Sequence, residues 1–118
     1  MTLMPVQSAG DTAIDLSYAN WFEALDYTCS QIQKLDFDIA LIGAGAYGFF
    51  LGRFCKQMGK QAIHMGGALQ LLFGIKGLRW EKQYPPEFGQ SLFNEHWVYP
   101  AQNECPAGAE KIENGCYW

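Results

Sequence analysis

Residues 37–48 read FDIALIGAGAYG, an apolar run that ends in three glycines spaced as G-x-G-x-x-G. This pattern predicts a buried strand over Asp38–Ile42 that enters a tight turn and then opens a helix. Gly43 permits the sharp turn, Gly45 removes a Cβ atom that would block a ligand, and Gly48 lets helix and strand approach closely. The helix start offers unpaired N–H groups and a positive dipole end to an anion. The plain alternative is a tight turn without a ligand.

The flanking sequence extends this motif to a strand–helix–strand unit. An apolar face predicts a helix over 46–58, and Gly59 is placed to end it as a C-terminal cap. A second strand is predicted at Gln61–Met65, and Gly66-Gly67 then repeats the glycine junction ahead of another helix at 68–73. Only about two residues separate the helix at 46–58 from the second strand, which fits a right-handed crossover between parallel strands.

A further helix is predicted ahead of the glycine motif. Asn20 followed by Glu23 has the form of a capping box, and apolar residues then recur at helical spacing over 18–34. The continuous apolar strand at 38–42 suits a strand that is covered on both faces. The predicted fold class is therefore α/β, a three-layer Rossmann-like domain with a small, mainly parallel sheet.

Length and composition indicate one domain over 1–118, with an irregular lead-in at 1–16 and an aromatic-rich, proline-bearing covering segment at 76–118. Within that segment, short strands are expected at 97–99 and 111–113. Two parallel strands are too few for a stable sheet. The chain is therefore expected to recruit further strands, to form a homo-oligomer or to belong to something longer.

Charge and cysteine content narrow the class of protein. The net charge of −4 argues against nucleic-acid binding, and no apolar run is long enough for a membrane span. Neither a signal peptide nor a C-x-x-C pair is visible. We therefore expect a cytoplasmic protein with reduced thiols, whose cysteines are Cys29, Cys55, Cys105 and Cys116.

The candidate ligand is a small molecule that carries a phosphate. The residues expected to bind it are those of the two glycine junctions, one strand end and one basic rim position: Gly43, Gly45, Ala46, Tyr47, Gly48, His64, Gly66, Gly67 and Arg79. A dinucleotide site would also need a carboxylate at the end of the second strand, where this chain has His64 and Met65. This disfavours NAD or FAD and leaves a mononucleotide or sugar nucleotide.

Catalytic residues are less sharply indicated. Glu95 and His96, with His64 as a third candidate, supply a carboxylate and imidazoles that can do acid–base work. The alternative is a polar loop cluster without a reaction. No metal-ligand spacing is visible, so no metal site is predicted.

Several strings resemble the C-terminal portion of a family of bacterial and viral proteins found among polysaccharide-related genes. The matching stretches are PVQS at 5–8, WFEAL at 21–25, FDIALIGAGAYG at 37–48, GKQAIHMGGALQLLFGIKGLRW at 59–80, NEHW at 94–97 and GCYW at 115–118. That family is in turn distantly similar to the nucleotide-sugar-binding half of the D-type glycosyltransferase fold, whose outline residues 43–48 and 61–67 match.

The resemblance implies a glycosyltransferase-like protein that binds a nucleotide sugar. It also implies an acidic metal-binding segment ahead of residue 1, so catalysis is expected to need residues that this chain lacks. The alternative hypothesis is a non-catalytic module that keeps the Rossmann-like scaffold and uses its aromatic tail for self-association.

Overall fold

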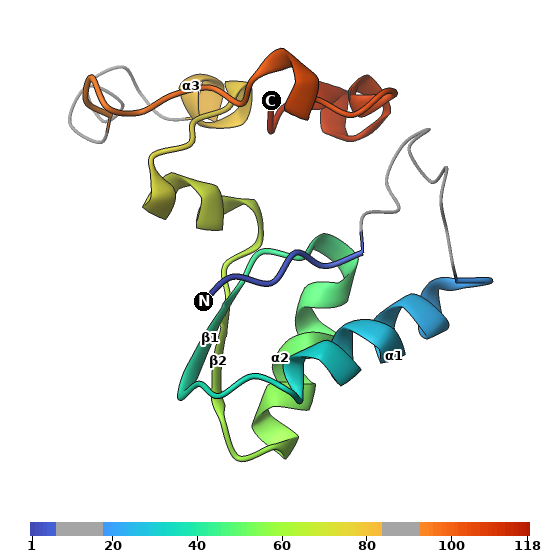
Figure 1. Cartoon of the computed structure of the whole chain (residues 1–118). Helices are drawn as coiled ribbons and strands as arrows, with labels where there is room; N and C mark the ends of the chain where they lie inside the picture. The colour runs from blue at the N-terminus through green and yellow to red at the C-terminus, as the bar shows by residue number, and fades with distance from the viewer. Residues whose placement is uncertain (7–17, 84–92) are drawn as a thin grey trace. The chain divides into compact units, whose positions relative to one another are not determined.

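The computed structural model describes residues 1–6, 18–83 and 93–118, which form two compact units. The first unit contains residues 1–6 and 18–69, and the second contains 70–83 and 93–118. The chain combines helices with a small parallel sheet, which confirms the α/β prediction at that level (Figure 1). Residues 7–16 of the predicted lead-in and 84–92 of the aromatic segment lie outside the described residues.

The first helix, α1 (Trp21–Ile32), begins after its N-cap Asn20, the first residue of the predicted capping box. The Asn20 side chain accepts hydrogen bonds from the N–H groups of Phe22 and Glu23 at 3.0 and 3.1 Å. The Glu23 carboxylate in turn accepts from the Ala19 N–H at 2.9 Å and from the Asn20 amide at 3.1 Å. Asn20 thereby satisfies two orphan donors at the helix start, whereas Glu23 binds the Ala19 N–H and the Asn20 side chain and not the Asn20 N–H that a complete capping box uses.

The predicted strand–helix–strand unit is present. Strand β1 (Ile39–Ile42) and strand β2 (Gln61–His64) pair in parallel, with Ile39 opposite Gln61 and Ile42 opposite His64. They are connected through a 3₁₀ turn, η2 (Gly45–Tyr47), and helix α2 (Gly48–Gln57).

Helix α2 ends as the sequence predicts. Gly59 adopts φ +77, in the left-handed region that favours glycine. The N–H of Lys60 then donates to the Cys55 carbonyl at 3.0 Å, which satisfies a C-terminal carbonyl of the helix.

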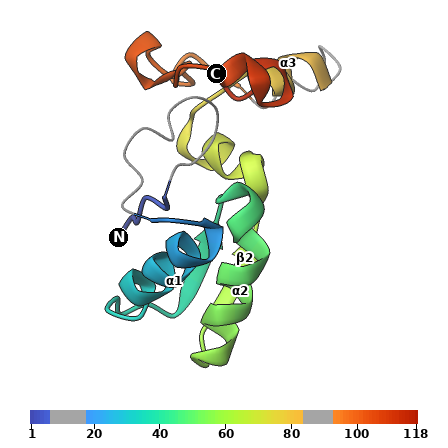
Figure 2. The same ribbon diagram turned by 90° about the vertical axis from the view of Figure 1, so that its right-hand side faces the viewer.

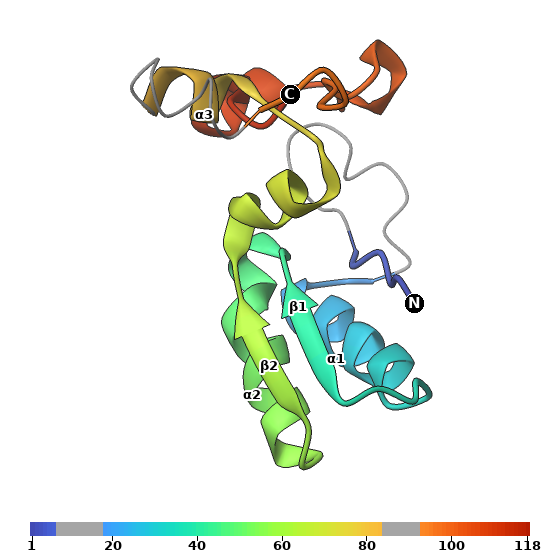
Figure 3. The ribbon, with the colours of Figure 1, turned by 90° about the vertical axis from the view of Figure 1, so that its left-hand side faces the viewer.

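The core of the first unit lies on one face of the sheet. Figure 2 shows α1 and α2 in front of the strands, and Figure 3, from the opposite side, shows the strands in front of both helices, so the two helices cover the same face. The buried cluster joins residues from both helices, β1 and the turn: Ala24, Ile32, Ile42, Tyr47, Leu51 and Cys55. Burial raises the pKa of the Cys55 thiol, as expected for a cysteine that packs as a small apolar side chain.

The opposite face of the sheet is exposed, although β1 was expected to be covered on both sides. Ile39, Leu41 and Ile63 point away from the helices and are 47, 44 and 49 % exposed. An apolar run alone cannot distinguish a strand covered twice from one covered once, because it carries no information about what packs on it.

The second unit is organised around residues 74–80. Ile75 and Val98 form a parallel bridge, in which the Lys76 N–H donates to the Val98 carbonyl and the Val98 N–H donates to the Gly74 carbonyl, both at 2.9 Å. Where a short strand was expected at 97–99, the structure has this single bridge at Val98.

The end of the chain packs against the same segment. The Arg79 N–H donates to the Cys116 carbonyl at 2.8 Å, and the Gln70 amide donates to the Tyr117 carbonyl at 3.2 Å. A Cβ atom at Gly77 would lie 2.7 Å from the Tyr117 carbonyl oxygen, so the close approach requires glycine there.

Short helices make up most of the regular structure here. They are η3 (Gly66–Phe73), which begins in the first unit, α3 (Leu78–Gln83), η4 (Gln102–Glu104), η5 (Ala109–Lys111) and η6 (Glu113–Gly115). The helix expected at 68–73 is therefore a 3₁₀ helix. The strand expected at 111–113 is wrong, because 3₁₀ turns occupy this part of the chain.

Of the helices in the described part of the chain, none combines the length and apolar character that crossing a membrane requires.

The first glycine of α2 is in tight contact with β2. A Cβ atom at Gly48 would lie 2.3 Å from Nε2 of His64, whose ring packs edge-on against Phe49 at a centroid distance of 4.7 Å. The close helix–strand approach predicted for Gly48 is thus made through the side chain of His64.

This contact predicts that Gly48→Ala has opposite effects on stability in the presence and in the absence of the His64 side chain. Gly48 is helical, with φ −55. Gly48→Ala should therefore destabilise the wild-type chain by about 1 kcal/mol or more, because the imidazole must move. In a His64→Ala background the same change should stabilise by about 0.5–1 kcal/mol, as Ala replaces Gly in a helix. Guanidinium unfolding of the four proteins measures this, and an equal effect in both backgrounds would contradict the packing described.

Candidate functional site

The two glycine junctions meet at the carboxyl ends of the two strands. A Cβ atom at Gly43 would lie 2.8 Å from the Gly66 carbonyl oxygen and 2.9 Å from the Leu69 Cβ atom. Because backbone stands on one side of this contact, it cannot be relieved by a side-chain rotation. Gly43 is therefore the residue that lets the turn after β1 lie against the turn after β2.

Open space lies next to this contact. Gly45 and Gly66 adopt φ +47 and +58, and a Cβ atom on either would meet nothing within 4 Å. Side chains are rare in this backbone conformation, so the glycines are explained by the turn itself. A ligand would need the open space beside these glycines in addition to the close contact of the two turns.

The N–H groups of the turn divide into two sets. Tyr47 donates to the Ala44 carbonyl at 3.0 Å, and Gly48 donates to the Gly45 carbonyl, so these two N–H groups are used within the turn. The N–H groups of Gly45 and Ala46 have no acceptor among the described residues.

The same holds at the second junction, where neither the Gly66 nor the Gly67 N–H has an acceptor within residues 1–6, 18–83 and 93–118. We call the four N–H groups of Gly45, Ala46, Gly66 and Gly67 the glycine cradle. Clusters of backbone N–H groups in such turns are suited to bind anions.

Two described side chains next to the cradle are engaged in packing. The ring of Tyr47 is buried and stacks on Trp21 at a centroid distance of 5.1 Å and an interplanar angle of 5°. It therefore serves the core instead of covering Gly45. The half-buried imidazole of His64 lies at the end of β2 against Gly48, and Ala46 is exposed.

The remaining predicted site residues belong to the second unit. Glu95 and His96 approach each other, with 3.7 Å between the Glu95 Oε1 and His96 Nε2 atoms, and both side chains are about four-fifths exposed. Exposed pairs of this kind contribute little to stability. The His96 N–H also donates to the Asn94 side chain at 2.9 Å.

Arg79 lies in a cluster that the sequence analysis did not identify. Its guanidinium donates to the Glu113 carboxylate at 2.7 Å and to the hydroxyl of Tyr117, and it lies over the Tyr117 ring. The Cys116 thiol donates to the same Glu113 oxygen at 3.6 Å. Burial and this hydrogen bond raise the pKa of the Cys116 thiol, so the neutral thiol is favoured.

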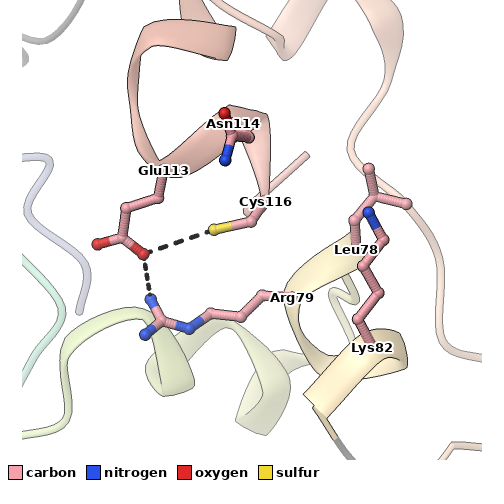
Figure 4. Close-up of a pocket in the computed structure, with 6 residues that line it drawn as sticks. All are labelled: Leu78, Arg79, Lys82, Glu113, Asn114 and Cys116. Atoms are coloured by element: carbon pink, nitrogen blue, oxygen red, sulfur yellow. Dashed lines mark hydrogen bonds and ion pairs between the residues drawn. The ribbon is translucent and has the colours of Figure 1, made fainter.

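This cluster borders a cavity of about 220 Å³ (Figure 4). Leu78, Arg79 and Lys82 line it from α3, and Glu113, Asn114 and Cys116 line it from the C-terminal turn. The i, i+3 spacing of Glu113 and Cys116 could have suggested that both side chains share one face of a turn. Their pairing with Arg79, 34 residues earlier, had no signal in the sequence.

A second side-chain interaction in this unit involves Tyr99, which is 43 % exposed. A hydrogen bond to the Glu81 carboxylate, together with burial, raises the pKa of Tyr99 to about 12. The Lys76 ammonium also lies 4.9 Å from the centre of the Tyr99 ring.

The Tyr99 hydroxyl predicts a specific loss of stability in alkali. An unfolded tyrosine ionises near pH 10, so the stabilisation is fully present below about pH 10 and is lost as the pH rises toward 12. Measured by guanidinium unfolding, the free energy of unfolding should fall less between pH 9 and pH 11.5 for Tyr99→Phe and for Glu81→Gln than for the wild-type chain. Equal losses in all three proteins would contradict the hydrogen bond.

Metal binding finds no support in the part of the chain that the structure describes, where no three His, Cys, Asp or Glu side chains are grouped to hold an ion. No protein-family model matches this chain, and no curated protein or solved structure is significantly similar to it.

Proposed function

We propose that the first unit binds the phosphate of a nucleotide or nucleotide sugar at the glycine cradle, as part of a glycosyltransferase-like protein. The observation that carries this proposal is the geometry of Gly45. Its N–H has no acceptor among the described residues, and the space where a side chain would stand is empty. A phosphate oxygen could therefore reach the backbone at hydrogen-bonding distance.

The position of the cradle also supports the proposal. In parallel α/β sheets, ligands bind beyond the carboxyl ends of the strands, and both glycine junctions follow such ends. The start of α2 adds the positive end of a helix dipole to the N–H groups. The strand end after β2 carries His64 and Met65 without a carboxylate, which favours a mononucleotide or sugar nucleotide over a dinucleotide.

The proposal includes a three-layer Rossmann-like arrangement in the functional protein. The helices α1 and α2 supply one outer layer, and the exposed face of Ile39, Leu41 and Ile63 is where a third layer would pack. A cytoplasmic location is also part of it. Of the predicted catalytic residues, His64 belongs to the same unit as the cradle. Glu95, His96 and Arg79, whose guanidinium pairs with Glu113, belong to the second unit and are not part of this proposal.

Isothermal titration with UMP, UDP, GDP and their sugar conjugates tests the proposal. Saturable binding of at least one of them is the expected result. A folded protein that releases or absorbs no heat with any of them would contradict it.

A matched pair of variants separates binding from folding. Gly45→Ala adds a Cβ atom to the cradle, while Gly59→Ala adds one in the same left-handed conformation and equally open space after α2. Both should destabilise by about 1–2 kcal/mol, the cost of a left-handed alanine. Only Gly45→Ala should weaken nucleotide binding, by about tenfold. Equal affinities for the two variants would argue against a ligand at Gly45.

The exposed sheet face also favours a second candidate function, a self-association module. The outward positions of the two strands are Ile39, Leu41, Gln61 and Ile63, three aliphatic side chains and one neutral amide. A second copy would present the same uncharged face, so its packing would require no charge to be desolvated in a chain of net charge −4.

Analytical ultracentrifugation measures the self-association of the chain directly. If two copies pack face to face, Leu41→Gln should shift the chain toward monomer. Phe22→Gln, at a side chain that is even more exposed on α1, should leave the association unchanged. A wild-type chain that stays monomeric at high micromolar concentration would remove this candidate.

A further inference from the structure

We infer that the cavity beside α3 is a second binding site, specific for a small oxyanion such as a phosphate or carboxylate group. This site lies wholly within the second unit, and it does not depend on the proposed function of the glycine cradle. Its walls come from α3 and from the turn at 113–116 (Figure 4).

The charged side chains that line the cavity indicate the sign of the charge on its ligand. Arg79 and Lys82 contribute two cations, and Glu113 contributes one carboxylate. The lining is therefore net positive in a chain of net charge −4. Arg and Lys at i, i+3 on α3 face the same space, an arrangement that suits the oxygens of one anion.

The volume limits the size of the ligand. At about 220 Å³ the cavity is smaller than the roughly 300–1,000 Å³ of sites that enclose drug-sized ligands. It can take an inorganic ion or the anionic end of a larger molecule. A complete nucleotide would not fit inside it.

The wall opposite α3 is held in an unusual backbone conformation. Glu113 and Asn114 have φ +47 and +57, and Gly115 follows with φ +68. Left-handed backbone at non-glycine residues persists only where the surroundings fix it. Here Arg79, Cys116 and Tyr117 all donate to the Glu113 carboxylate, which fixes that side chain at the cavity.

This arrangement makes Glu113 an internal competitor of the ligand. Its carboxylate already accepts from the Arg79 guanidinium at 2.7 Å, the same donor that an anion would use. An oxyanion must therefore share or displace this contact, and Lys82 supplies the second donor. Removing the Glu113 charge should then strengthen anion binding, whereas removing the Lys82 charge should weaken it.

The test is an amide NMR titration of the full chain with potassium phosphate, at ionic strength held constant with potassium chloride. Saturating shifts are expected at residues 78–82 and 113–116. Lys82→Gln should weaken this binding by about tenfold, and Lys56→Gln, at an exposed lysine of α2, should leave it unchanged. Glu113→Gln should bind more tightly than the wild-type chain.

The same spectra keep the two sites apart, because phosphate at the glycine cradle would shift residues 43–48 and 66–67 instead. Shifts confined to the cradle, or equal affinities for wild type, Lys82→Gln and Lys56→Gln, would overturn the inference. If Glu113→Gln does not fold, the comparison of the two lysine variants decides the question alone.

Discussion

The close contact between Gly43 and the turn at Gly66 is the constraint on which the candidate site depends. With the Gly66 carbonyl oxygen 2.8 Å and the Leu69 Cβ atom 2.9 Å from where a Cβ atom would stand, no other residue fits at Gly43 without moving backbone. The contact brings two glycine junctions from neighbouring strands side by side. Within residues 1–6, 18–83 and 93–118, one junction alone offers two N–H groups without an acceptor, and the pair offers four.

The sheet that carries this contact is covered on one side only. Ile42 and Ala62 pack toward the helices, while Leu41 and Ile63 on the opposite face remain about half exposed. A two-stranded sheet gains little stability from its own hydrogen bonds, so burial under α1 and α2 holds it together. The proposals of a third layer and of self-association both follow from this asymmetry, since either would bury the remaining aliphatic side chains.

Local sequence signals predicted the first unit well. The Asn20 N-cap, the Gly59 cap and the two strands are where pattern and backbone chemistry place them, because each depends on residues within one or two turns. The structure of the second unit was harder to predict from the sequence. Its contacts join residues far apart in the chain, such as Arg79 with Glu113, and its 3₁₀ turns at 109–115 depend on left-handed residues that have no hydrophobic period. The Asn114-Gly115 pair was the signal available for a turn there.

The central claim is that the N–H groups of Gly45 and Ala46, which have no acceptor among the described residues, bind an anion. Amide hydrogen exchange measured residue by residue tests this most directly. The account predicts that both amides exchange without protection in the ligand-free chain, whereas the Tyr47 amide, which donates to Ala44, is protected. Addition of a nucleotide that binds should then slow exchange at Gly45 and Ala46. Protection of these two amides in the ligand-free chain would contradict the account.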